Sequence, residues 1–203
     1  MKRITSICIF AFCVAVILSG CSQISTSAKS DKIISLDAGW RSNVVGGNNA
    51  VKDGTSADIS FIRVTEAAEE RWVDIMTLQV NLAAGNEWKL GEFILEGEQF
   101  VKKLRNANGI KFTVIGDGKA GWKVMFPMKE TVSDSCWHEA DFPTKIGQSV
   151  NIDIPFSQLT QPDWGRSVTF NRSSITSIIF QRFASDNKLS GTSAIKIYNL
   201  EIY

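Results

Sequence analysis

The stretch GIKFTVIGDGKAGWKVMFPM (109–128) has the pattern of two strands joined by a tight turn. In its first half Ile110, Phe112 and Val114 alternate with polar residues. Side chains of a strand point alternately to opposite faces, so this period of two predicts a strand with one face in a core. The glycine-rich DGKAG that follows is typical of a turn, and WKVMFPM predicts a second strand.

Similar short segments, rich in β-branched and aromatic residues and bounded by Gly, Asn, Asp or Pro, recur along the chain. Only residues 96–105 carry apolar residues at helical spacing, which predicts one short helical turn. Roughly nine or ten strands in one domain predict an all-β fold, a β-sandwich or jelly roll. The other predicted strands cover residues 33–36, 58–64, 71–82, 136–142, 148–156, 174–183 and 194–203.

Composition limits the function classes. The chain has 203 residues, 44% of them hydrophobic, which suits one globular domain with a sizeable core. Its formal net charge is +1, and neither sign of charge is gathered in blocks. Binding to nucleic acid through neutralised phosphates is therefore not expected.

The N-terminal segment has the order of a secretion signal. Lys2 and Arg3 precede an apolar run from Ile4 to Leu18, and LSGC (18–21) follows. This order resembles the lipobox of bacterial lipoproteins, in which the cysteine is lipidated. We predict a signal peptide at 1–20, a lipidated Cys21 with a flexible tether over 21–31, and a β-domain at 32–203. A plain membrane anchor with an incidental Cys21 is the alternative.

The lipobox resemblance implies a bacterial cell-envelope location, at the outer membrane or the cell surface. Cys8 and Cys13 leave with the predicted signal peptide and Cys21 takes lipid. Cys136 then stays alone, so the mature domain has no intramolecular disulfide.

SDSCWHEADF (133–142) holds the only histidine of the chain, His138, close to Cys136. A thiol and an imidazole two positions apart raise the possibility of nucleophilic catalysis, which needs the two groups adjacent and a third group that orients the base. One cysteine and one histidine do not make a four-ligand zinc site. The commoner role of such a cysteine is a small buried hydrophobe. We therefore expect no enzyme, and a small hydrolase remains a third alternative.

A set of ordered motifs in the second half points to a family. After 109–128 come an acidic-Phe pair at 141–142, an IPF strand exit at 154–156, a Trp-Gly at 164–165 and the final pattern IKIYNL (195–200). These motifs resemble those of the family 11 carbohydrate-binding modules and the related complex I intermediate-associated protein family. Both are galactose-binding-domain-like β-jelly rolls. The resemblance covers 109–203 well and 33–108 weakly.

The resemblance implies a non-catalytic module that binds β-glucan chains on a concave sheet face. We expect no cofactor, with calcium as the one that the resemblance raises. Calcium occurs in relatives, whose last strand often carries an aspartate where this chain has Tyr198. Expected partners are a polysaccharide or oligosaccharide, a membrane through the N-terminal lipid, and other envelope proteins, but no nucleic acid. The alternative is an interaction or scaffold lipoprotein that uses the jelly roll without binding sugar.

Sugar recognition on a sheet needs flat aromatic rings and planar polar groups. If Val124 and Phe126 face the core, alternation turns their neighbours Lys123 and Met125 toward the ligand. If Phe142 is core, then Cys136 and His138 lie with it, and the residues between them face the ligand unless a bulge intervenes. The glycan-binding residues predicted in this way are Lys123, Met125, Trp137, Glu139 and Asp141. Trp88 is added because its context, GNEWKLGEF, is polar, and Gln181 or Arg182 because the neighbouring strand can reach sugar hydroxyls.

The remaining tryptophans are expected to be structural. Trp40 and Trp72 are predicted to lie in the core, and Trp164 is predicted to pack against a sheet edge. If Trp88, Trp122 and Trp137 all prove buried, the scaffold alternative is favoured over glycan binding.

Overall fold

The computed structural model describes all residues except 1–35, 37–38, 48–52, 67–70, 86 and 185–188, and the side chains of 66, 71 and 72. The predicted signal peptide, Cys21, the tether and most of the predicted strand at 33–36 therefore lie outside the described residues. In the described part no helix is long and apolar enough to cross a membrane.

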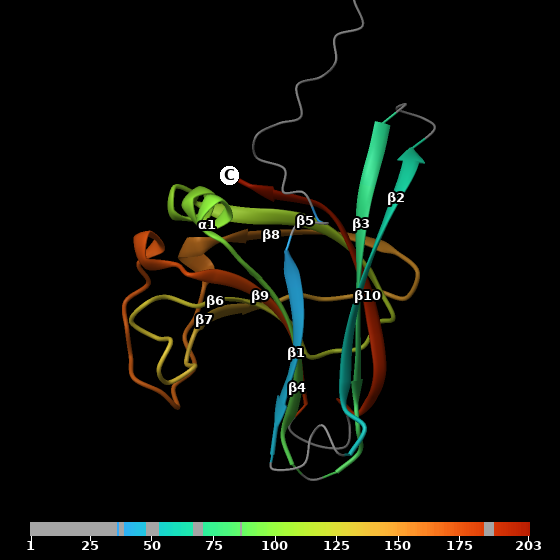
Figure 1. The fold of residues 1–203 in the computed structure, drawn as a ribbon, viewed down its shortest axis with the longest axis horizontal. Helices are drawn as coiled ribbons and strands as arrows, with labels where there is room; N and C mark the ends of the chain where they lie inside the picture. Colours follow the sequence, from blue (N-terminus) through green and yellow to red (C-terminus); the bar gives the residue numbers. More distant parts are fainter. Residues whose placement is uncertain (1–35, 37–38, 48–52, 67–70, 86, 185–188) are drawn as a thin grey trace, which may run out of the picture.

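Ten strands form two five-stranded sheets that pack face to face as a sandwich (Figure 1). All paired strands are antiparallel. The first sheet has the order β1 (Trp40–Gly46), β4 (Lys89–Glu96), β9 (Ser177–Ala184), β6 (Trp122–Phe126) and β7 (His138–Asp141). The second sheet has the order β2 (Ser56–Glu66), β3 (Arg71–Leu82), β10 (Gly191–Ile202), β5 (Gly109–Gly116) and β8 (Ser149–Pro155).

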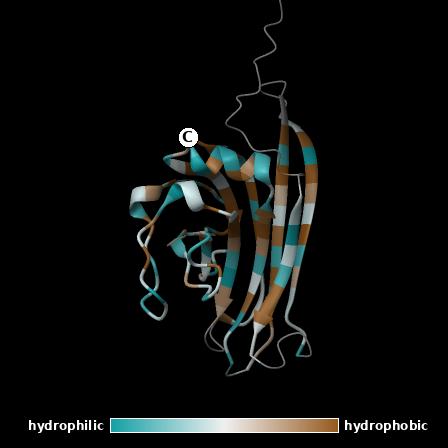
Figure 2. Cartoon of the chain, turned by 60° about the vertical axis from the view of Figure 1, so that its left-hand side comes forward, coloured by the Kyte–Doolittle hydropathy of each residue, from teal (hydrophilic) through white to brown (hydrophobic). Residues whose placement is uncertain are grey.

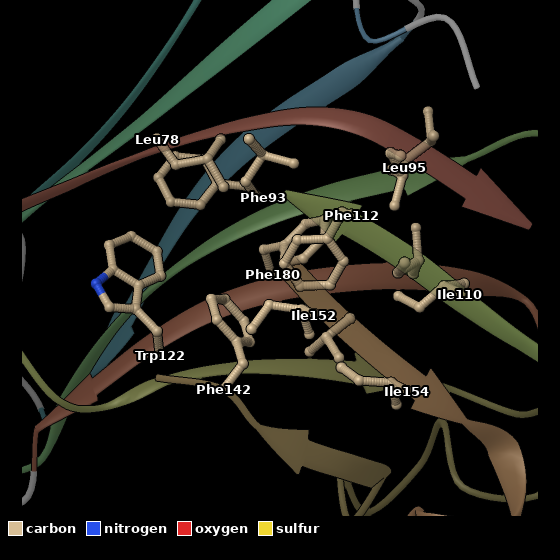
Figure 3. Packing of buried hydrophobic residues seen from close by; sticks show 14 of the residues in the cluster. Leu78, Phe93, Leu95, Ile110, Phe112, Trp122, Phe142, Ile152, Ile154 and Phe180 are labelled. Atoms are coloured by element: carbon tan, nitrogen blue, oxygen red, sulfur yellow. The ribbon is translucent and has the colours of Figure 1, made fainter. Parts of the chain in front are cut away.

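The core lies between the sheets and is built by the alternation seen in the sequence. Hydrophobic and hydrophilic bands alternate along the long strands (Figure 2). On β5, Ile110, Phe112 and Val114 are buried. Phe112 meets Phe142 and Phe180 edge to face, with ring centroids 5.2 and 5.3 Å apart (Figure 3). Aromatic rings prefer this geometry, so the contacts fix how the two sheets sit on each other.

One helix, α1 (Glu98–Arg105), follows β4 at one end of the sandwich (Figure 1). An acidic residue in its first turn and basic residues in its last turn match the helix dipole. Val101 and Leu104 are its buried residues. Two 3₁₀ turns, η1 (Phe156–Gln158) and η2 (Arg172–Ser174), lead out of β8 and into β9.

The all-β sandwich with one short helix confirms the predicted fold class. The sequence reasoning missed β1 and β4, and β4 shows why. Its central residues FIL (93–95) form a continuous apolar run, buried on both faces of the sheet, so the period of two is lost. The predicted strand at 136–142 begins only at His138.

The tryptophans divide between core and surface. Trp40 is buried, as predicted, and Trp122 is 1% exposed. The prediction for Trp164 was wrong, because this side chain is 65% exposed in the loop that follows η1. The side chain of Trp72 is outside the described part of the chain.

Candidate functional site

Alternation along the first sheet sends every second side chain away from the second sheet. On β6, Trp122, Val124 and Phe126 point into the main core, and Lys123 and Met125 point the opposite way. We call the surface made by these outward side chains the outer face. Because residues paired across antiparallel strands point to the same side, the register aligns outward residues in rows across all five strands.

One row of the outer face is entirely polar. At its centre the carboxylate of Glu92 accepts a hydrogen bond at 3.1 Å from Asn43 Nδ2 and another at 3.1 Å from Gln181 Nε2. Glu92 and Gln181 are only 5% and 4% exposed. The two amides therefore hold a sheltered carboxylate in a fixed position. From β1 to β7 the polar row reads Asn43, Glu92, Gln181, Lys123 and Asp141.

The neighbouring row is apolar in its middle. Ile94, Met125 and Ile179 form a small cluster of buried side chains that is separate from the main core. Trp137 packs against this cluster, and its indole Nε1–H donates to the carbonyl oxygen of Thr131 at 3.2 Å. That hydrogen bond fixes a half-buried aromatic ring at the β7 side of the outer face. From β1 to β7 the apolar row reads Arg41, Ile94, Ile179, Met125 and Glu139.

The charges of the outer face are unevenly paired. Lys123 Nζ donates to Glu139 Oε1 at 2.5 Å, which joins the two rows. No lysine or arginine among the described residues makes an ion pair with Glu92 or Asp141. The face therefore offers hydrogen-bond acceptors and excess negative charge, a chemistry suited to hydroxyl groups and unsuited to anions.

Six of the predicted glycan-binding residues come together on this face. They come from β6, β7 and β9 and from the residue just before β7, and their contacts with a ligand remain predictions. The six are Lys123, Met125, Trp137, Glu139, Asp141 and Gln181.

Arg182 lies on the other side of the sheet, which corrects its suggested place beside Gln181. It pairs with the core residue Trp122 and is 0% exposed. Its Nη1 and Nη2 donate to the carbonyl oxygens of Gly191 at 2.9 Å and Leu189 at 2.7 Å. Desolvation by burial lowers the pKa of this guanidinium, and nearby Asp117 acts in the opposite direction. Arg182 thus supports the core and cannot reach a ligand on the outer face.

Trp88 lies at the other end of the outer face. It precedes β4, where alternation puts it on the side of Leu90 and Glu92, and it is 46% exposed. The backbone pairing of β1 and β4 continues to it, because Gly47 N–H donates to the Trp88 carbonyl at 3.2 Å. Trp88 is therefore on the outer face but separated from Trp137.

Sequence reasoning missed Asn43 and Glu92, because it did not predict β1 and β4. One signal was available. Glu92 is a single carboxylate inside the segment KLGEFILE, and a charge in so apolar a run needs partners.

Cys136 and His138 are placed for packing. The Cys136 thiol donates to the Pro162 carbonyl oxygen at 3.1 Å. His138 meets Phe170 with ring centroids 5.1 Å apart, and burial lowers its pKa, which favours a neutral imidazole. The thiol and the imidazole thus have different partners, and neither arrangement activates a nucleophile.

Calcium is the metal ion that the family resemblance raised. In the described part of the chain no three His, Cys, Asp or Glu side chains lie close enough to hold a metal ion. A lysine ammonium group is surrounded by oxygens instead. Lys89 Nζ lies 2.8 Å from Asp53 Oδ2 and donates to the carbonyl oxygens of Ala83 and Ala84. An ammonium group here uses oxygens of the kinds that calcium prefers. The ammonium group of Lys89 thus engages these oxygens, and calcium binding stays a prediction of the family resemblance.

No protein-family model and no curated protein matches this chain. Solved structures do match. A family 11 carbohydrate-binding module of the cellulosomal cellulase Lic26A-Cel5E of Clostridium thermocellum is 16% identical, with a TM-score of 0.53, over 84% of this chain and 92% of that one. The Clostridium thermocellum family 11 module in complex with a β-1,3-1,4-mixed-linked tetrasaccharide is 17% identical, with a TM-score of 0.50, over 84% and 94%.

An exo-β-agarase also matches, with 9% identity and a TM-score of 0.50, over 85% of this chain and 25% of that one. At these identities the similarity shows the jelly-roll fold.

Proposed function

We propose that this chain is a non-catalytic glycan-binding module whose outer face binds a β-glucan-type polysaccharide. The observation that carries the proposal is the polar row, which crosses all five strands beside an apolar row and the ring of Trp137. A pyranose ring presents hydroxyl groups at its edge and a C–H face, and the two rows match these surfaces. Acceptors are abundant on the face, so a neutral glycan suits it better than an acidic one.

Two further observations support the proposal. The fold is shared with modules of family 11, one of which was solved with a mixed-linked glucan tetrasaccharide bound. The hydrogen bonds that Glu92 accepts, and the one that Lys123 donates to Glu139, hold the polar groups in place before any ligand arrives. Fixed groups lose little conformational entropy on binding, which favours recognition of a flexible chain.

The test is affinity electrophoresis of the 32–203 domain against soluble mixed-linked β-glucan, xyloglucan, galactomannan and alginate. We expect retardation by a neutral β-glucan and none by alginate. Trp137→Ala is expected to raise the Kd by about 30-fold, since truncating an aromatic anchor of a binding site costs about 2 kcal/mol. Lys196→Ala, at an exposed outward position of β10 in the second sheet, is the control and should bind like the wild type. Absence of retardation by every glycan overturns the proposal.

A second candidate is an interaction module that does not bind sugar. The observation that favours it is the low exposure of Ile94, Met125 and Ile179, at 6%, 6% and 2%, which leaves the middle of the outer face little ligand-accessible surface. Of the three tryptophans used as the criterion, Trp122 is buried, Trp137 is half-buried and Trp88 is exposed, so the criterion for this candidate is not met. Cross-linking to an envelope protein without glycan retardation would favour it.

We also propose that a lipid on Cys21 holds the domain at the bacterial cell envelope. The proposal rests on the order of Lys2-Arg3, the apolar run and LSGC (18–21). Labelling with an alkyne fatty acid should mark the wild-type protein. The control variants Cys8→Ser and Cys13→Ser should be labelled as well. Cys21→Ser should lose both the label and membrane fractionation. Equal labelling of Cys21→Ser contradicts the lipid anchor.

A further inference from the structure

Trp164 is a large aromatic side chain that the fold leaves in solvent. It is 65% exposed, more than any other described tryptophan. The loop that carries it, 160–168, begins where Thr160 pairs with Glu139 on the free edge of β7. Residues paired across antiparallel strands point to the same side, so Thr160 extends the row of Glu139 on the outer face. The loop is thus a continuation of that face past its last strand.

The backbone on both sides of Trp164 is tightly braced. Gln161 Nε2 donates to the carbonyl oxygens of Cys136 at 2.7 Å and Arg166 at 2.9 Å, and Gln161 Oε1 accepts from Val168 N–H at 2.8 Å. Arg166 N–H donates to Asp134 Oδ2 at 3.3 Å. One glutamine therefore ties both arms of the loop together and joins them to the segment before β7.

Cys136 completes this brace. Its thiol donates to the Pro162 carbonyl oxygen at 3.1 Å, two residues before Trp164. Gly165, directly after Trp164, packs so closely that a Cβ there would lie 2.3 Å from Cys136 Cβ. A side chain cannot occupy that space without moving the loop. Cys136 therefore holds the segment that carries Trp164 in place, through one hydrogen bond and one close packing contact.

The contacts between loop 160–168 and the segment before β7 also limit the position of Trp164. Cys136 precedes Trp137, and Gly165 follows Trp164. The close contact of Gly165 with Cys136 then keeps the Cα atoms of the two tryptophans within about 13 Å of each other, at 3.8 Å per residue step. In Figure 1 the loop before β7 and the loop after η1 extend from β6 and β7 on the side away from β5 and β8. That side is the outer face.

We infer that Trp164 is an additional sugar-stacking platform, which extends the glycan-binding face beyond β7 and makes it favour longer chains. The inference rests on the proposed function. An exposed indole on a rigid loop offers a flat apolar surface at low entropic cost, which is the requirement for stacking on a pyranose ring. A glycan that lies along the polar row and over Trp137 meets Trp164 only when it is long enough to pass the β7 edge.

The experiment is isothermal titration of the wild type, Trp164→Ala and Trp164→Phe with a trisaccharide and a hexasaccharide of mixed-linked β-glucan. We expect Trp164→Ala to weaken hexasaccharide binding about 10-fold and trisaccharide binding less than 2-fold. Trp164→Phe keeps a ring and should recover most of the hexasaccharide affinity. Since the side chain is largely exposed, these variants should fold like the wild type, and Ile146→Ala, exposed on another loop, is the matched surface control.

A second variant tests the brace. Gly165→Ala places a Cβ against Cys136 and must displace the loop, so it should weaken hexasaccharide binding more strongly than trisaccharide binding, which depends on Trp137 beside Cys136. If the wild type binds glucan and Trp164→Ala binds the hexasaccharide equally well, the platform is overturned and the proposed function stands. If the wild type binds no glucan of either length, the proposed function itself is overturned and the platform with it.

Discussion

The outward faces of the two sheets obey the same alternation but differ in burial. On the second sheet the outward side chains Thr77, Lys196 and Asn151 are half-exposed or exposed, as expected for a solvated antiparallel sheet. On the first sheet the outward Ile179, Gln181 and Glu92 are 2–5% exposed. Outward direction and exposure are thus separate properties. A sheltered outward face with paired polar groups is the feature that distinguishes a candidate site from ordinary surface.

The largest expected effect is a difference in stability between two identical truncations, one on the outward face of each sheet. Ile179→Ala removes a fully packed outward side chain and should lower the free energy of unfolding by about 2–4 kcal/mol, as a core truncation does. Ile115→Ala, at an outward and half-exposed position of β5, should cost less than about 1 kcal/mol. Urea denaturation of both variants measures the two values. Equal losses would show that the outer face is not sheltered in solution.

A smaller effect is expected from the carboxylate of the polar row. Glu92→Ala leaves the amides of Asn43 and Gln181 without their acceptor in a sheltered place, which should cost about 1–3 kcal/mol. Asp58→Ala, at an exposed outward position of β2, is the control and should change stability by less than about 0.5 kcal/mol. Denaturation by urea is again the measurement. A Glu92→Ala protein as stable as the control would contradict the role of this carboxylate.

The smallest effect concerns pH and the second sheet. Desolvation, followed by the hydrogen bond to Asp153, raises the pKa of Tyr203 from 10.0 to about 12. A raised folded-state pKa means that the protonated phenol contributes stability below pH 10 and that this contribution is lost between pH 10 and 12. The difference in unfolding free energy between wild type and Tyr203→Phe should therefore shrink over that window. A difference that stays constant would contradict the raised pKa of Tyr203.

The sequence predicted the parts of this protein in which local pattern and fold agree. The period of two in β5 and β6 fixed which side of each strand faces the core, and it put Lys123 and Met125 outward. It missed β4, whose continuous apolar residues carry no facing information, although the similar apolar run of β9 was predicted as a strand. The partners of Glu92 could not be predicted, since Asn43 and Gln181 are 49 and 89 positions away in the chain.

By itself the sequence determined the all-β class, the facing of the strands with clear alternation, and the order of motifs that resembles a glycan-binding family. These follow from local spacing, because a side chain's direction on a strand depends only on its position along that strand. Only the tertiary structure decided that Arg182 faces the core, that Cys136 braces a loop and that Trp164 stands in solvent. Those outcomes depend on which distant backbone carbonyls and side chains meet, and packing between segments sets that.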